Sequence, residues 1–164
     1  MRLRQNGFSL IELLIVVAII LIIAAIAIPS LIRSKMAANE ASAVESLRSI
    51  NTAEVAYTTS YPTVGFSTLL ADLGGSVAVC AGGPSVTSAC LVDPIVAASD
   101  TTAKSGYLNT YGGVVASSGV NTSYTLNADP ANRGTTGQRS FFTDQTCILR
   151  VDPSVVATAA SSPL

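Results

Sequence analysis

The 164-residue sequence contains no histidine and no tryptophan. Histidine is the commonest general base and a frequent metal ligand, so its absence removes the usual catalytic triads and most zinc or non-haem iron sites. Charged residues make up only 12% of the chain, with nine basic and ten acidic side chains. This balance gives no general attraction to nucleic acid or to anionic lipid. We therefore expect no enzyme, no cofactor and no specific nucleic-acid partner.

Cysteine is also scarce, with three residues and no C-x-x-C pair. The spacing excludes thioredoxin-like and c-type haem motifs. In an oxidising compartment one disulfide would form and one cysteine would be left over. Cys80 and Cys90 bracket a short loop of small residues, so we expect the bridge between them. A bridge from Cys147 to either of them, and three free thiols, are the alternatives.

What the chain does contain is a long apolar run near its N-terminus. Residues 13–28 include no charged, polar, Gly or Pro residue. Together with residues 8–11 they reach the roughly 20 residues that a membrane-spanning helix needs. Glu12 is the lone carboxylate of this segment, and an ionisable group on a spanning helix is costly unless it has a partner. Pro29 closes the run and predicts either an end or a kink of the helix, and the helical pattern that follows favours a kink.

The residues before the run are typical of a leader whose cleavage would keep the helix. Residues 1–7 are short and basic and end in Gly7, whereas an ordinary secretory signal is cut after its apolar region. Cleavage between Gly7 and Phe8 would give Phe8 a free amine. Inside a bundle of helices, a neighbouring copy's amine could then pair with Glu12. The alternative is an uncleaved signal anchor.

The segment GFSLIELLIVVAIILIIAAIAIP resembles the N-terminal segment of type IV pilins and of the related type II secretion pseudopilins. The shared features are a short basic leader, Gly before Phe, Glu at the fifth position after the cut, and Pro after the run. In that family a membrane peptidase cuts after the Gly and methylates the new N-terminal Phe, and the Glu is needed for assembly. The resemblance therefore implies processing at Gly7 and N-methylation of Phe8. It also implies an assembly role for Glu12, and it covers roughly the first third of the chain.

The helical pattern continues beyond Pro29. An apolar stripe recurs at spacings of three and four, at Ala43, Leu47, Ile50, Ala53 and Tyr57. Pro62 disfavours helical geometry at the residue before it and predicts the helix end. A helix over residues 8–60 would be about 80 Å long at 1.5 Å per residue, longer than a head of about 100 residues can cover. Its apolar half would then need shelter in lipid or among copies of itself.

The remainder predicts one small antiparallel head. Residues 61–105 are rich in Gly and Pro and predict a connecting loop with a helical turn near residues 69–73. Three or four short antiparallel strands are expected from the segments at residues 107–115, 123–128, 138–143 and 147–152. The last two would form a hairpin, in which family members commonly have Gly at the place of Cys147. The tail from residue 153 onward is expected to be loosely held.

Two further groups of residues are candidate sites. Secretion pseudopilins hold calcium in the head, and that likeness would assign it to Asp129, Asp144 and Asp152. These residues form no alternating D-x-D-x-D-G loop, so they are expected to be turn formers and surface groups, and no metal is expected. Three arginines near the last hairpin could form a basic spot, although on an acidic head they more often serve solubility: Arg133, Arg139 and Arg150.

The expected architecture is an α+β, pilin-like fold, in which a long kinked N-terminal helix packs on a small antiparallel sheet head. Residues 1–7 form the removed leader, and 8–29 the transmembrane and filament-core helix. Residues 30–60 pack on the head, 61–105 connect, and 106–164 form the sheet and C-terminal tail.

The resemblance implies a structural subunit of a type IV pilus, a helical homopolymer supporting adhesion, surface motility or DNA uptake. The precursor would sit in the inner membrane with its N-terminus in the cytoplasm, and the assembled pilus would be extracellular. Prepilin peptidase and the pilus assembly machinery are the implied partners. A major pseudopilin of a type II secretion system and a single-pass membrane-anchored binding protein are the alternatives.

Overall fold

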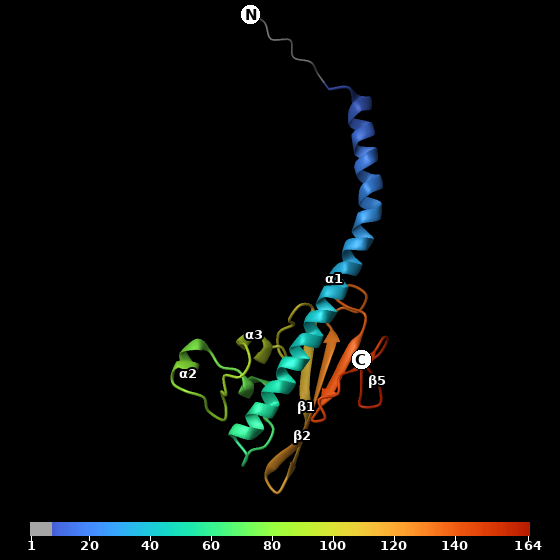
Figure 1. The fold of residues 1–164 in the computed structure, drawn as a ribbon. Coiled ribbons are helices and arrows are strands. Elements are labelled where there is room, and N and C mark those ends of the chain that lie inside the picture. The colour runs from blue at the N-terminus through green and yellow to red at the C-terminus, as the bar shows by residue number, and fades with distance from the viewer. Residues whose placement is uncertain (1–7) are drawn as a thin grey trace, which may run out of the picture. The chain divides into compact units, whose positions relative to one another are not determined.

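The computed structural model describes residues 8–164 (Figure 1). The chain divides into two compact units, one up to Lys35 and one comprising Met36–Leu164. Helix α1, Leu10–Ser60, runs through the boundary and contributes to both.

The first unit consists of the N-terminal part of α1. The helix begins at Leu10, two residues after the predicted start at Phe8, and it continues through Pro29. Pro29 has no backbone N–H to donate to the preceding turn, so one helical hydrogen bond is missing there. The kink at Pro29 stays a prediction.

In the second unit, α1 packs on one antiparallel sheet. The five strands follow in the order β1-β2-β3-β4-β5. Their bounds are β1 Tyr107–Ser117, β2 Val120–Pro130, β3 Ser140–Asp144, β4 Arg150–Asp152 and β5 Ser162–Pro163. Figure 1 shows the second half of α1, from cyan to green, lying across one face of this sheet. The α+β fold is therefore as predicted.

The helix contributes to the core through the predicted stripe. All five members of the stripe are buried, and Leu47, Ile50 and Tyr57 have no exposed surface. They meet Tyr124, Leu126 and Phe141 from the sheet, together with Tyr107 at the start of β1. The apolar side chains of the helix recur about every 3.6 residues, and those of the strands alternate. Both sets therefore face the same core.

The connecting segment contains three short helices. These are the 3-10 helix η1, Leu70–Leu73, and the α-helices α2, Val77–Ala81, and α3, Pro94–Ala97. η1 confirms the predicted helical turn, and Leu70 and Leu73 are fully buried. Asp93 caps α3 by accepting a hydrogen bond from the N–H of Ile95 at 2.8 Å.

The first hairpin is longer than predicted. β1 and β2 extend to a two-residue connection, Ser118 and Gly119, whose φ angles are 54° and 82°. Positive φ at both central residues is the geometry of the type I′ turn, which matches the twist of the two strands. The residues around this turn are polar, and for this reason the strands predicted from the sequence were shorter than β1 and β2.

The C-terminal predictions were wrong in two respects. β4 covers only Arg150–Asp152, because Cys147 adopts φ 60° and ends the extended conformation expected there. The tail is held instead of loose. β5 pairs with β4, the N–H of Leu164 donates to the Leu149 carbonyl at 2.9 Å, and Ala157 is 1% exposed.

Candidate assembly site

The candidate assembly site lies at the start of α1. Glu12 is in the first turn and is exposed, and the Leu13 N–H donates to the Ser9 carbonyl at 3.3 Å. The N-terminal end of a helix carries partial positive charge, so a carboxylate is favoured there. Phe8 precedes the helix and is 78% exposed. Gly7, the other predicted processing residue, lies outside the described residues.

In the part of the chain that the structure describes, the apolar segment after Glu12 is almost entirely exposed. It is the one helix in residues 8–164 that is long and apolar enough to cross a membrane, and none of its most apolar 18-residue window is buried. Leu and Ile side chains here are about half to three-quarters exposed, for example Leu21 at 63% and Ile26 at 74%. An uninterrupted apolar surface of this kind marks a membrane or protein contact.

Glu40 anchors the second half of α1 to the sheet. Its carboxylate accepts hydrogen bonds from the N–H groups of Gln138 and Arg139, and from Arg139 Nε at 2.7 Å. Burial raises the pKa of Glu40, but these hydrogen bonds and the Arg139 charge outweigh it, and the pKa lies below its usual value. The charged form is therefore favoured in the folded head.

A second buried carboxylate, Glu54, joins three elements. It has no exposed surface and accepts hydrogen bonds from Ser67 N–H at 3.0 Å, Ser67 Oγ at 2.6 Å and Tyr111 Oη at 2.6 Å. Burial of the Tyr111 side chain is the main cause of its raised pKa, and the negative charge of the Glu54 carboxylate is the next. This cluster links α1, the segment after it and β1.

Asn51 forms a third polar contact between α1 and the sheet. Its side chain donates to Thr143 Oγ1 and accepts from Tyr124 Oη, both at 2.9 Å. The sequence-based reasoning missed all three of these polar positions. Each of these positions lies three or four residues from a member of the apolar stripe, and this spacing could have indicated that it faces the sheet: Glu40, Asn51 and Glu54.

The predicted disulfide is confirmed, because Cys80 and Cys90 are bonded. Gly75 packs against it, since a Cβ added at Gly75 would lie 2.7 Å from Cys80 Sγ and 2.9 Å from Cys90 Sγ. The remaining cysteine, Cys147, is free and exposed. Its backbone is left-handed, with φ 60°, a conformation that glycine adopts without strain.

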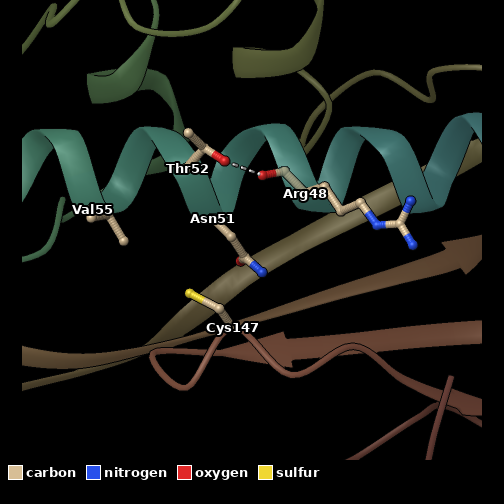
Figure 2. Close-up of a pocket in the computed structure, with 5 residues that line it drawn as sticks. All are labelled: Arg48, Asn51, Thr52, Val55 and Cys147. Carbon is tan, nitrogen blue, oxygen red and sulfur yellow. Dashed lines mark hydrogen bonds between the residues drawn. The ribbon is translucent and has the colours of Figure 1, made fainter.

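Cys147 lines a groove against α1 of about 480 Å³. The other lining residues are Arg48, Asn51, Thr52 and Val55. Figure 2 shows Cys147, on the loop before β4, and Asn51, on α1, facing each other across it.

Two of the candidate calcium-binding aspartates accept hydrogen bonds from residues close by in the sequence. Asp144 accepts hydrogen bonds from Thr146, and Asp152 accepts them from Ser154 and Val155. Among residues 8–164 no three His, Cys, Asp or Glu side chains gather as a metal site. Asp144 and Asp152 therefore act as turn formers.

Each of the three arginines has hydrogen-bond partners of its own. Arg133 donates to the Gln138 carbonyl and to Ser140, Arg139 pairs with Glu40, and Arg150 donates to the Ser161 carbonyl. Each guanidinium holds a different segment of the head in place.

Comparison with known proteins identifies an N-terminal sequence motif and a relative. The prokaryotic N-terminal methylation motif matches residues 2–28. The chain thus carries the N-terminal motif of the type IV pilins and pseudopilins, which are structural proteins. Type IV major pilin protein PilA of Myxococcus xanthus (strain DK1622) is 46% identical over 54 residues, which are 33% of this chain and 24% of that protein. The chain therefore matches about a quarter of the relative's length, and no solved structure matches it.

Proposed function

We propose that this chain is the structural subunit of a type IV pilus and polymerises through the N-terminal half of α1. The observation that carries the proposal is the combination of the methylation motif with an apolar helical segment whose most hydrophobic window is entirely unburied. The similarity to a type IV major pilin supports the same function.

The apolar segment requires an environment other than water. Burying one Leu or Ile side chain is worth about 1.5–3 kcal/mol, and this segment contains many of them. A bilayer satisfies this need, because a helix pairs its own backbone groups. A bundle of identical helices satisfies it as well, and a heterologous contact that does not close generates an open helical filament.

Glu12 would select the register of this bundle. Prepilin peptidase would cut after Gly7 and leave an N-methylated amine on Phe8. A neighbouring copy's amine would then neutralise the Glu12 carboxylate, which is otherwise costly in a medium of low dielectric constant. Subunits that meet in another register would leave both charges without a partner.

The precursor would reside in the inner membrane with its N-terminus in the cytoplasm and its head outside. The disulfide between Cys80 and Cys90 supports this orientation, because such bonds persist in oxidising compartments. The assembled filament would be extracellular. Adhesion, surface motility or DNA uptake would depend on its assembly and retraction machinery.

Electron microscopy of the native host tests the proposal. Cells lacking the gene should lose a class of thin surface filaments, and a plasmid copy should restore them. An antibody against the head should label the filaments along their whole length. Unchanged filaments in the deletion strain would contradict the proposal.

A further inference from the structure

Two exposed cations, Arg33 and Lys35, follow the apolar run of α1. Both belong to the first unit, whose described part has Glu12 as its other charged residue. Among residues 8–164 the one ion pair joins Arg139 to Glu40, and residues 29–39 contain no side-chain carboxylate. Each cation is therefore open to an anion from outside the chain.

A groove of about 510 Å³ lies on α1 just before Lys35. Its lining residues are Ala27, Ile28, Ser30, Leu31 and Ser34. Lys35 comes four residues after Leu31, and residues four apart lie on one face of a helix. Helical side chains also lean toward the N-terminal end of their helix, so the stem of Lys35 extends toward the groove. Arg33 is two residues from both Leu31 and Lys35, so it faces a different side of α1.

The groove changes in chemical character along the helix. It is apolar at Ala27 and Ile28. Further along, Ser30 and Ser34 contribute hydroxyl groups, and Lys35 adds a positive charge beyond them. A glycerophospholipid has the same order of groups, from acyl chain through ester to phosphate. Hydroxyls donate to ester carbonyls, and an ammonium group pairs with a phosphate, so the two surfaces are complementary in polarity and charge.

The position of Lys35 along α1 fits the same ligand. The helical segment from Leu10 to Ile28 spans about 28 Å at 1.5 Å per residue, close to the roughly 30 Å hydrocarbon core of a bilayer. Lys35 begins roughly 10 Å beyond Ile28, and its side chain leads back toward the apolar run. The headgroup layer on each side of the core is about 5–7 Å thick. The ammonium group therefore reaches the level of the lipid phosphates.

We propose that α1 carries a phospholipid site, in which Lys35 binds the phosphate and the groove beside Pro29 holds the upper part of an acyl chain. The inference rests on the proposed function, because it requires the membrane-resident precursor. The bound lipid fixes the depth of α1 in the bilayer, and it leaves when the helix enters a filament. A carboxylate of a second copy is the competing partner for Lys35.

Solid-state NMR tests the phosphate contact. The chain has two lysines, and Lys104 lies in the head, where it donates to Ser46 Oγ at 2.9 Å. The full chain, isotope-labelled at the lysine side-chain carbons, is placed in vesicles of phosphatidylcholine and phosphatidylglycerol. Carbon–phosphorus dipolar recoupling should attenuate the Lys35 signal and leave the Lys104 signal unchanged. Lys35→Arg should remove the attenuation, and Lys104→Arg should keep it.

The same labelled chain in phosphorus-free maltoside micelles with inorganic phosphate separates a lipid from a free ion. Attenuation in the vesicles alone is expected. Equal attenuation in the micelles would show an adventitious ion only and would overturn the lipid site. An inserted chain whose Lys35 signal is unaffected in vesicles would also overturn it. A chain that does not enter the vesicles would instead contradict the proposed function.

Native mass spectrometry of the chain, released from its host membrane in mild detergent, measures the lipid itself. The unmodified chain should retain a phospholipid, and Lys35→Gln should lower the retained fraction at least about tenfold, the effect of losing one charge-assisted hydrogen bond. Arg33→Gln is the matched control, because Arg33 is an exposed cation on a different side of the helix, and it should leave retention unchanged.

Two results of these membrane experiments would overturn the site. Equal loss of lipid from Arg33→Gln and Lys35→Gln would show a general attraction of charge and no site. A carbodiimide cross-link from Lys35 to a carboxylate of another copy, formed in the host membrane, would put a second copy in the place of the lipid.

Discussion

Arg139 donates from Nε to Glu40 Oε2 at 2.7 Å, and this ion pair joins two residues 99 positions apart in the sequence. It fastens the segment before β3 to the head-packing part of α1. Glu40 is 7% exposed, so the carboxylate end of the pair is shielded from water, whereas 46% of the Arg139 side chain is exposed. Its strength is therefore expected to be visible in the stability of the head.

Acid should weaken this connection. The pKa of Glu40 is lower in the folded chain than its ordinary value of 4.5. The resulting stabilisation is complete above the unfolded pKa and is lost as the pH falls through the folded one. Glu40→Gln should therefore lower the melting temperature near neutral pH, and the difference from the unmodified chain should shrink below about pH 4.5.

Circular dichroism of the detergent-solubilised chain at several pH values measures this effect. Glu45→Gln is the control, because Glu45 is an exposed glutamate of the same helix. A difference for Glu40→Gln that stays constant down to acid pH would show that the charge is unimportant.

Loss of the Glu54 carboxylate should destabilise the head. Glu54→Ala would leave Tyr111 Oη and the Ser67 N–H, both now bonded to the carboxylate, without this acceptor. Removing one partner of a buried polar group costs about 1–3 kcal/mol. Chemical denaturation should show a loss of this size, whereas Glu45→Ala should change the unfolding free energy by less than about 0.5 kcal/mol. Equal effects of the two substitutions would refute the role of this cluster.

The elements predicted correctly depend on local patterns. The stripe from Ala43 to Tyr57 follows the helical period, and this is why the buried face of α1 could be predicted. The bridge between Cys80 and Cys90 could be predicted for a similar reason, because only ten positions separate the two residues.

The missed features depend on partners that are distant in the sequence. Glu40 pairs with Arg139, and Asn51 bonds to Thr143, because the packing of the sheet on the helix brings these residues together. The tail was expected to be loose because its composition shows no pattern. Its order comes from pairing with β4 and from the hydrogen bond between Asn127 Nδ2 and the Ala157 carbonyl at 2.6 Å.

Loss of the disulfide between Cys80 and Cys90 should destabilise the head. A loop of this length restricts the unfolded chain by about 2–3 kcal/mol in the chain-entropy treatment. The double substitution of Cys80 and Cys90 to Ser should lower the unfolding free energy by about that amount. Denaturation of the Cys147→Ser variant is the comparison, because that thiol is already free. A loss for Cys147→Ser as large as for the double variant would contradict this assignment.

Substitution of Glu12 should separate membrane residence from assembly. Glu12→Gln removes the charge and keeps the length of the side chain, so the subunit should remain in the membrane fraction. Filament yield should fall steeply, because the amine of the neighbouring copy loses its counter-charge. Immunoblots of membrane and sheared fractions measure both quantities, with Glu45→Gln as the matched control. Full filament yield from Glu12→Gln would refute the pairing.

Mass spectrometry of sheared surface filaments tests the central claim most directly. We expect that the filament subunit is this chain, that it begins at an N-methylated Phe8, and that it retains the apolar segment after Glu12. A chain that still carries residues 1–7 and is found only as a membrane-bound monomer would contradict it.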